Sequence, residues 1–234
     1  MLNRLLLYST LVKQSTIMPE IMISGPAGRL ESRYHPPKVS GAPMALILHP
    51  HPNPEGEMMH RGTMNNKVTY ALFHTLAKAG YATLRFNFRG VGKSQGTYDK
   101  GEGELADAAA AMDWLQSQNA EAKYAVVAGF SFGSWIAMQL LMRRPEIYRF
   151  IAVAPPANKY DFTFLAPCPS SGMMLLGDQD DIVTESSVRQ LATKLSRQKG
   201  IKVDYRLLSG VDHYFTNRLD DLVYNVSDYL ETIG

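Results

Sequence analysis

The chain lacks several features that would point to common protein classes. It has one cysteine, Cys168, in 234 residues, which excludes an internal disulfide and fits a reducing compartment such as the cytoplasm. Its 24 lysines and arginines nearly balance 22 acidic residues, and a net charge of +2 gives no reason to expect nucleic acid as a partner. No apolar run is long enough to cross a bilayer.

What the chain does contain is an ordinary globular composition, with 45% hydrophobic and 20% charged residues, arranged in alternating patterns. Short apolar runs predict strands, and apolar residues at helical spacing predict helices between them. Strands are expected at 20–24, 30–34, 42–49, 81–88, 124–128, 148–154, 173–176 and 201–207, and helices at 68–76, 105–115, 134–142, 185–195 (with Thr184 as N-cap) and 219–233.

This alternation predicts an α/β fold, with a mostly parallel central sheet that helices cover on both faces. Ligands bind such sheets beyond the carboxyl ends of the strands. Only a short, proline-marked connection separates the strand ending near Pro155 from the one starting near Met173. It leaves no room for a helical cap domain, so we expect a relatively open site.

Residues 1–17 differ from the rest, since they are basic and hydroxyl-rich and no acid occurs before Glu20. Three interpretations fit: an extension upstream of a true start at Met18, an organellar presequence, or an ordinary N-terminal arm. No repeat or low-complexity linker divides residues 18–234, which are expected to form a single domain.

The most informative motif is Gly129-Phe130-Ser131-Phe132-Gly133. An apolar, β-branched run leads into it and a helix-compatible run leads out, which is the context of a nucleophile elbow. Larger residues in place of the two glycines would collide with the adjacent strand and helix. The tight turn predicts a strained backbone at Ser131 that presents its hydroxyl at a helix N-terminus.

A serine hydroxyl needs a base to take its proton and a carboxylate to orient that base. In the order typical of this kind of site the acid and then the histidine follow the serine. Of the aspartates at 178, 180 and 181, the common form Gly-x-x-Asp-x-x-Val selects Asp180, with Asp178 as the alternative. His213 is the only histidine after the acid, and we predict it to be the base.

An oxyanion hole requires two backbone N–H groups. The residue after the serine, Phe132, supplies one. The loop after the strand at 44–48 supplies the other, and because its prolines have no N–H, His51 and Asn53 are the candidates, with His51 at the usual position. Phe130, Asn53 and Tyr214 are the expected residues of the substrate pocket.

Two rival motifs do not hold up, so we expect neither a metal nor another cofactor. His49, His51 and His60 look like metal ligands, but no cysteine or carboxylate completes the set at recognisable spacing. Gly92-Lys93-Ser94 suggests a phosphate-binding loop, but Asn87 stands where its first glycine belongs and Gly96 interrupts the helix that should follow.

At this point the chain resembles the small, cap-less bacterial α/β-hydrolases related to the dienelactone-hydrolase-like branch. The matching segments run from residue 18 to the C-terminus: Gly25-Pro26-Ala27-Gly28-Arg29-Leu30-Glu31, His49-Pro50-His51-Pro52, Thr63-Met64-Asn65-Asn66, Leu84-Arg85-Phe86-Asn87-Phe88-Arg89-Gly90, Ala128-Gly129-Phe130-Ser131-Phe132-Gly133 and Asp212-His213-Tyr214-Phe215. The resemblance implies Ser131, Asp180 and His213 as a catalytic triad and Met18 as the natural start.

The chain departs from that family in two ways. The 53–62 loop is longer than the family's connection, and a loop there could act as a partial lid. Dienelactone hydrolases use a cysteine nucleophile, whereas this chain has Ser131.

The sequence therefore predicts a serine hydrolase of the carboxylesterase type that cleaves a small ester or thioester through an acyl-enzyme. The alternatives are an amidase or acyltransferase with the same triad, and a non-catalytic binding module that keeps the fold.

Overall fold

The computed structural model describes residues 20–52 and 62–233; residues 1–17 and most of the 53–62 loop lie outside this part. In chain order its elements are β1 (Glu20–Gly25), β2 (Gly28–His35), β3 (Met44–Leu48), α2 (Lys67–Lys78), β4 (Ala82–Phe86), α3 (Glu102–Gln118), β5 (Ala125–Phe130), α4 (Phe132–Leu141), β6 (Ile147–Val153), β7 (Gly172–Gly177), α5 (Glu185–Ser196), β8 (Val203–Leu208) and α6 (Leu219–Ile233).

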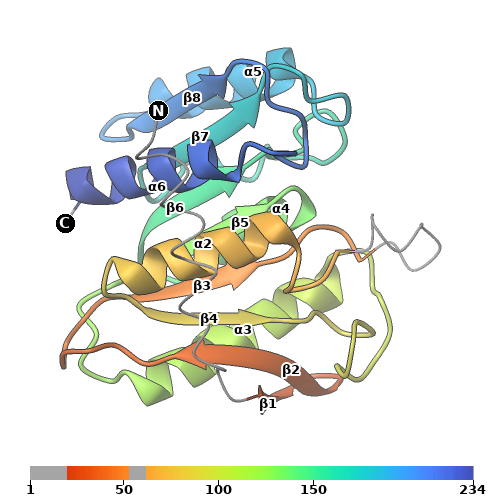
Figure 1. The fold of residues 1–234 in the computed structure, drawn as a ribbon, viewed down its shortest axis with the longest axis vertical. Helices are drawn as coiled ribbons and strands as arrows, with labels where there is room; N and C mark the ends of the chain where they lie inside the picture. The colour runs from red at the N-terminus through yellow and green to blue at the C-terminus, as the bar shows by residue number, and fades with distance from the viewer. Residues whose placement is uncertain (1–19, 53–61, 234) are drawn as a thin grey trace.

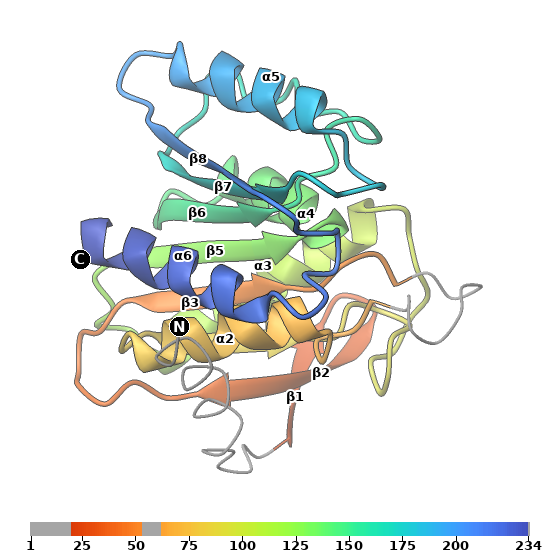
Figure 2. The same ribbon diagram turned by 45° about the horizontal axis from the view of Figure 1, so that its top comes forward.

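The strands form one eight-stranded sheet in the order β1-β2-β4-β3-β5-β6-β7-β8. The β1–β2 and β2–β4 pairs are antiparallel, and every other pair is parallel. Helices α2 and α6 lie side by side on one face, and α3 and α4 lie on the other (Figures 1 and 2). The predicted α/β fold with a mostly parallel sheet is confirmed.

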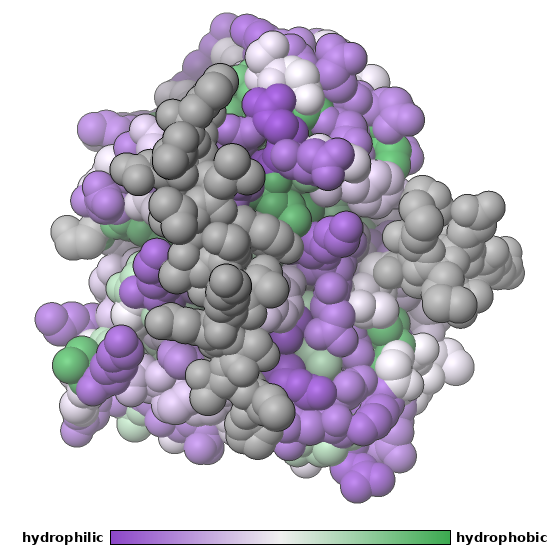
Figure 3. All heavy atoms as spheres, in the orientation of Figure 1, coloured by the Kyte–Doolittle hydropathy of each residue, from purple (hydrophilic) through white to green (hydrophobic). Residues whose placement is uncertain are grey.

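Strands β3, β5 and β7 are continuous apolar runs because helices cover both faces of the sheet, whereas β4 also contains Thr83 and Arg85. Every residue of β3, β4, β5 and β7 is buried. The coloured atoms of Figure 3, by contrast, are mostly hydrophilic, and their hydrophobic residues form small separate groups. No helix in the described residues is long and apolar enough to cross a membrane.

Two expected details differ in the structure. The strand predicted at 124–128 continues to Phe130, because Gly129 and Phe130 still pair with Ala152 and Val153 of β6. Thr184 does occupy the N-cap position of α5, but its hydroxyl makes no capping bond. Instead the Ser187 hydroxyl donates to the Thr184 carbonyl oxygen at 2.8 Å.

The connection between β6 and β7, residues 154–171, contains no helix. This confirms that no cap domain is inserted at this point of the fold. The carboxyl ends of β3, β5, β6, β7 and β8 therefore share one edge of the sheet with no inserted domain between β6 and β7.

Helix α4 begins so close to the sheet that side chains are excluded on both sides of its first turn. A Cβ atom on Gly133 would lie 2.4 Å from the Leu48 carbonyl oxygen and 2.5 Å from that of His49. A Cβ atom on Gly129 would lie 2.3 Å from the Gly133 carbonyl oxygen. These contacts are far inside van der Waals distance and involve backbone, which cannot move aside easily.

We expect Gly133→Ala to lower the free energy of unfolding by about 2–3 kcal/mol, because the new methyl group overpacks a rigid site. Alanine has the higher helix propensity, so any loss reports the clash alone. Gly200→Ala is the matched control, since its Cβ would meet nothing within 4 Å and only its φ of 82° is strained; it should cost about 1 kcal/mol. Equal stability of Gly133→Ala and wild type in urea unfolding would contradict the close approach.

Candidate active site

Ser131 lies in the turn between β5 and α4 with a left-handed backbone, φ 51° and ψ −122°. A non-glycine residue in this region carries strain of roughly 1–3 kcal/mol. Hydrogen bonds hold it there: the Ser131 N–H donates to the Val153 carbonyl oxygen at 2.8 Å, and the Ser134 hydroxyl donates to the Ser131 carbonyl oxygen at 2.6 Å. The strand, strained turn and helix that the sequence predicts around Ser131 are thus present.

Asp180 and His213 meet at the same edge of the sheet, from the loops after β7 and β8. His213 Nδ1 lies 2.7 Å from Asp180 Oδ2, and the two side chains are 4% and 0% exposed. The other carboxylate oxygen accepts the N–H groups of Ile182 at 2.9 Å and Val183 at 2.7 Å. Because a carboxylate only accepts, the Nδ1 proton faces Asp180, and Nε2 is left as the acceptor.

The four aspartates in the loops after β7 and β8 differ in their exposure and their hydrogen-bond partners. Asp178 is exposed and accepts the Gly210 N–H at 2.6 Å, a bond that lowers the pKa of its carboxyl group. Asp181 is exposed. Asp212 accepts the Thr216 N–H at 2.8 Å. Among these four residues, only Asp180 is bonded to the His213 ring.

The loops that carry Asp180 and His213 are locked together by their backbones. The Gln179 N–H donates to the Val211 carbonyl oxygen at 3.0 Å. A Cβ atom on Gly177 would lie 2.0 Å from that same oxygen, so only glycine allows this approach. Asp180 and His213 are therefore held at a fixed separation.

The His213 ring lies against the Phe130 ring, with centroids 5.0 Å apart, and Phe130 directly precedes Ser131. This contact holds the imidazole beside the Ser131 turn. Phe130, which the sequence predicts to line the substrate pocket, is fully buried as the last residue of β5. Tyr214 packs edge-on against His213 at 5.1 Å and is half-buried.

The two residues predicted to form the oxyanion hole are also brought together. The rings of His51 and Phe132 are 5.3 Å apart. Phe132 is the first residue of α4, where backbone N–H groups have no partner four residues earlier in the helix. Asn53, the alternative donor and expected pocket residue, lies outside the described residues.

His49 is engaged through both ring nitrogens and is not arranged as a metal ligand. Its Nδ1–H donates to the Pro50 carbonyl oxygen at 2.7 Å, and its Nε2 accepts the Phe88 N–H at 3.0 Å. Burial lowers the pKa of His49 to about 4. His49 is therefore a neutral side chain whose hydrogen bonds link the loops after β3 and β4.

Sequence reasoning missed an aromatic group beside Phe132. Tyr98, Trp135 and Tyr160 have ring centroids 6.2, 5.7 and 5.8 Å from that of Phe132. Trp135 is half-buried. The sequence does hold one indication of this position: Trp135 follows Ser131 by four residues, about one helical turn, and residues at that spacing lie on the same face.

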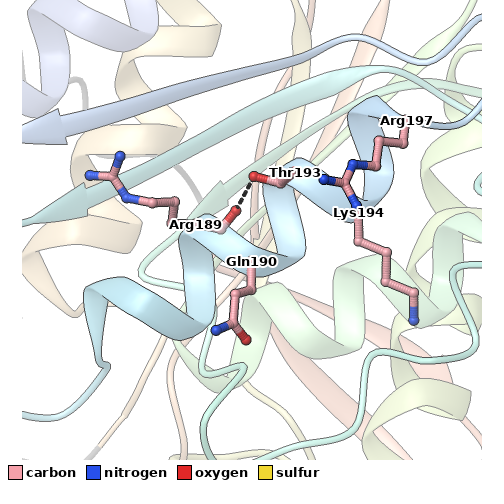
Figure 4. A pocket seen from close by; sticks show the side chains of 5 residues that line it. All are labelled: Arg189, Gln190, Thr193, Lys194 and Arg197. Carbon is pink, nitrogen blue, oxygen red and sulfur yellow. Dashed lines mark hydrogen bonds between the residues drawn. The ribbon is translucent and has the colours of Figure 1, made fainter.

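A hollow of about 330 Å³ lies elsewhere, along the outer face of α5 (Figure 4). Its lining residues come from that one helix: Arg189, Gln190, Thr193, Lys194 and Arg197. The Thr193 hydroxyl donates to the Arg189 carbonyl oxygen at 2.7 Å. None of the predicted site residues lines this hollow.

Comparison with known proteins identifies the family. The model of the X-Pro dipeptidyl-peptidase (S15) family matches residues 25–215, most of the chain. The chain belongs to this family of α/β hydrolases. An uncharacterised protein of Rickettsia prowazekii is 50% identical over 220 residues, which cover 92% of this chain and 90% of the relative.

Solved structures of similar proteins share the whole fold. A protein of unknown function from Agrobacterium tumefaciens, described as an α/β hydrolase, is 54% identical with a TM-score of 0.86, covering 91% of this chain and 95% of that one. An α/β serine hydrolase without lid from Xanthomonas campestris is 28% identical with a TM-score of 0.81, covering 93% and 95%. The resemblance to cap-less α/β-hydrolases is confirmed.

The buried neutral His49 of this S15-family chain predicts a loss of stability in acid. In the unfolded chain its pKa is near 6.5 and in the folded chain about 4, so the unfolded state takes up the proton first as the pH falls. We expect protonation of His49 to lower the free energy of unfolding by on the order of 3 kcal/mol between pH 7 and pH 4. Urea unfolding across this range should show a shallower pH dependence for His49→Gln than for wild type.

His74, whose pKa burial also lowers to about 4, keeps its share of the pH dependence in both proteins. The comparison therefore isolates His49. Parallel pH profiles for the two proteins would contradict a neutral His49, as would protonation of its ring above pH 6 in an NMR titration.

Proposed function

We propose that this protein is a carboxylesterase-like serine hydrolase that cleaves a small carboxylic ester or thioester. Ser131 is the nucleophile, His213 the general base and acid, and Asp180 the residue that orients His213. The backbone N–H groups of Phe132 and His51 form the oxyanion hole. A single buried cysteine suits a reducing compartment, and we place the activity in the cytoplasm.

The observation that carries this proposal is the buried hydrogen bond between Asp180 and His213. It fixes the tautomer that leaves Nε2 unprotonated, which is the form a general base needs. The Phe130 contact keeps this ring beside a serine in a strained strand-to-helix turn. Serine, base and acid thus gather at the sheet edge where α/β folds bind ligands.

The reaction follows from this arrangement in two halves. The Ser131 oxygen attacks the substrate carbonyl carbon while its proton passes to His213 Nε2, and the carbonyl oxygen becomes an oxyanion near the two N–H groups. His213 then protonates the leaving alcohol or thiol as the acyl-enzyme forms. Water enters, gives a proton to His213 and attacks the acyl carbon, and Ser131 recovers its proton as the acid leaves.

Three alternatives share the fold. The chain belongs to the X-Pro dipeptidyl-peptidase family, which supports amide cleavage by the same triad as a second candidate. Acyl transfer would need an acceptor other than water for the acyl-enzyme. A non-catalytic binding module would keep the fold and leave Ser131 inert to a fluorophosphonate probe.

Replacing the nucleophile is the direct test. We expect wild type to hydrolyse p-nitrophenyl esters of some acyl length and Ser131→Ala to lose at least about 10³-fold in kcat, because no acyl-enzyme can form. A fluorophosphonate probe should label wild type and not the variant. Turnover that survives in Ser131→Ala would contradict the serine mechanism. Faster cleavage of dipeptide amides than of every ester would instead favour a peptidase.

The role of Asp180 can be tested against its neighbour. Asp180→Asn presents an amide to His213 and favours the wrong imidazole tautomer, so we expect kcat to fall by about 10³–10⁴-fold. Asp178→Asn alters an exposed carboxylate in the same loop and should stay within a few fold of wild type. The reverse pattern would assign the acid to Asp178, and circular dichroism checks that both variants fold.

A further inference from the structure

Five rings form a continuous aromatic group beside Ser131, which we call the aromatic wall: His51, Tyr98, Phe132, Trp135 and Tyr160. Phe132 is its centre, because each of the other four rings lies within 6.2 Å of it, centroid to centroid. Trp135 and Tyr160 are stacked, with centroids 4.5 Å apart and planes 25° from parallel.

The wall is assembled from four separate parts of the chain. His51 comes from the segment after β3, Tyr98 from the segment after β4, Phe132 and Trp135 from the start of α4, and Tyr160 from the β6–β7 connection. All of these lie at the edge of the sheet where the parallel strands end, which is also the edge that carries Ser131. In cap-containing α/β-hydrolases a domain can rise from such a connection, whereas here it supplies Tyr160.

The side chains of the aromatic wall differ in how much of their surface is exposed to solvent. Phe132 is 1% exposed, but His51, Tyr98, Trp135 and Tyr160 are each only partly buried. Core packing normally buries such rings completely, and a large ring left half-covered keeps apolar surface available for a ligand. Phe132 is the next residue after Ser131, so the partly exposed rings surround the residue that adjoins the nucleophile.

The rings are also fixed in place. The Trp135 indole N–H donates to the Asp161 carbonyl oxygen at 2.9 Å, and His51 Nε2 and the Tyr98 hydroxyl oxygen share a hydrogen bond of 2.9 Å. Burial lowers the pKa of His51 and raises that of Tyr98 to about 12, so both are uncharged at neutral pH. A rigid, neutral surface loses little entropy when a flat ligand binds.

We propose that the aromatic wall binds a planar aromatic ring of the substrate and makes the enzyme prefer esters or thioesters that carry such a ring over aliphatic ones of equal size. This inference rests on the proposed function, since it names the substrate class of that site. A planar ring can stack on, or meet edge-on, the partly exposed faces of Trp135 and Tyr160. A puckered ring of equal carbon count fills similar space but gains no such contact.

The test compares substrates that differ only in aromaticity. One pair is the methyl esters of phenylacetic and cyclohexylacetic acid; the other is benzyl and cyclohexylmethyl acetate. Both pairs keep the reacting carbonyl insulated from the ring by a methylene group. We expect wild type to prefer the aromatic member of at least one pair by about 3- to 10-fold in kcat/KM.

Variants of the wall should remove that preference. Tyr160→Leu and Trp135→Leu are each expected to bring the ratio within a pair toward one. Trp114→Leu is the matched control, because Trp114 is also a half-buried tryptophan on a helix and packs on Tyr34, away from the wall. If Trp135→Leu does not fold, Tyr160→Leu carries the test, since its ring lies in a connection rather than in a helix.

The outcomes separate the two proposals. Turnover of both members of each pair at equal kcat/KM in wild type overturns the aromatic preference and leaves the hydrolase intact. A preference that survives in both wall variants, or that Trp114→Leu also abolishes, overturns the role of the wall. No turnover of any ester together with no fluorophosphonate labelling of Ser131 overturns the proposed function and this inference with it.

Discussion

The close approach of α4 to the end of β3 is the constraint on which the rest of the site depends. Glycine at 129 and 133 lets the helix begin against the backbone of Leu48 and His49, closer than any side chain allows. The chain then reverses within one residue, which forces Ser131 into its left-handed conformation. The same approach brings the first residue of α4 next to the segment that carries His51. A strained serine and the two proposed oxyanion donors are thus consequences of one packing contact.

A buried polar network behind the site holds the neighbouring segments in register with that contact. His49 ties the segment after β3 to the backbone of Phe88, and Asn87 accepts the Met64 N–H at 2.8 Å through its side-chain oxygen. The Asn87 amide in turn donates to the Glu31 carboxylate at 2.8 Å. Unpaired polar groups at these buried positions would be costly, so the network is stable only when all its segments are in place. This explains why His49, Asn87 and Glu31 are polar although they are buried.

The order of elements was predictable because buried strands and amphipathic helices each have a recognisable sequence pattern. The glycines around Ser131 likewise predict the tight turn between strand and helix. Asp180 followed from local loop chemistry, since its carboxylate caps the amides of the two residues that anchor the turn. The aromatic wall was not predictable in this way: His51 and Tyr98 are 47 positions apart, and their contact exists only once the sheet has formed. Features that depend on neighbouring residues can be predicted from the sequence, whereas contacts between distant loops depend on the register of the sheet.

No cap is inserted between β6 and β7, so the Asp180–His213 pair must be shielded from water by other parts of the fold. The Asp180 and His213 side chains are almost completely buried although the connection above them contains no helix. Contacts between loops contribute to this burial: Gly177 lies against the Val211 backbone, and the Phe130 ring packs against the His213 imidazole. A hydrogen bond kept out of water retains its strength and orients the ring. Because no domain is inserted between β6 and β7, we expect fixed side chains beside Ser131 to supply the selectivity, and the half-exposed rings around Phe132 are the ones we propose for this role.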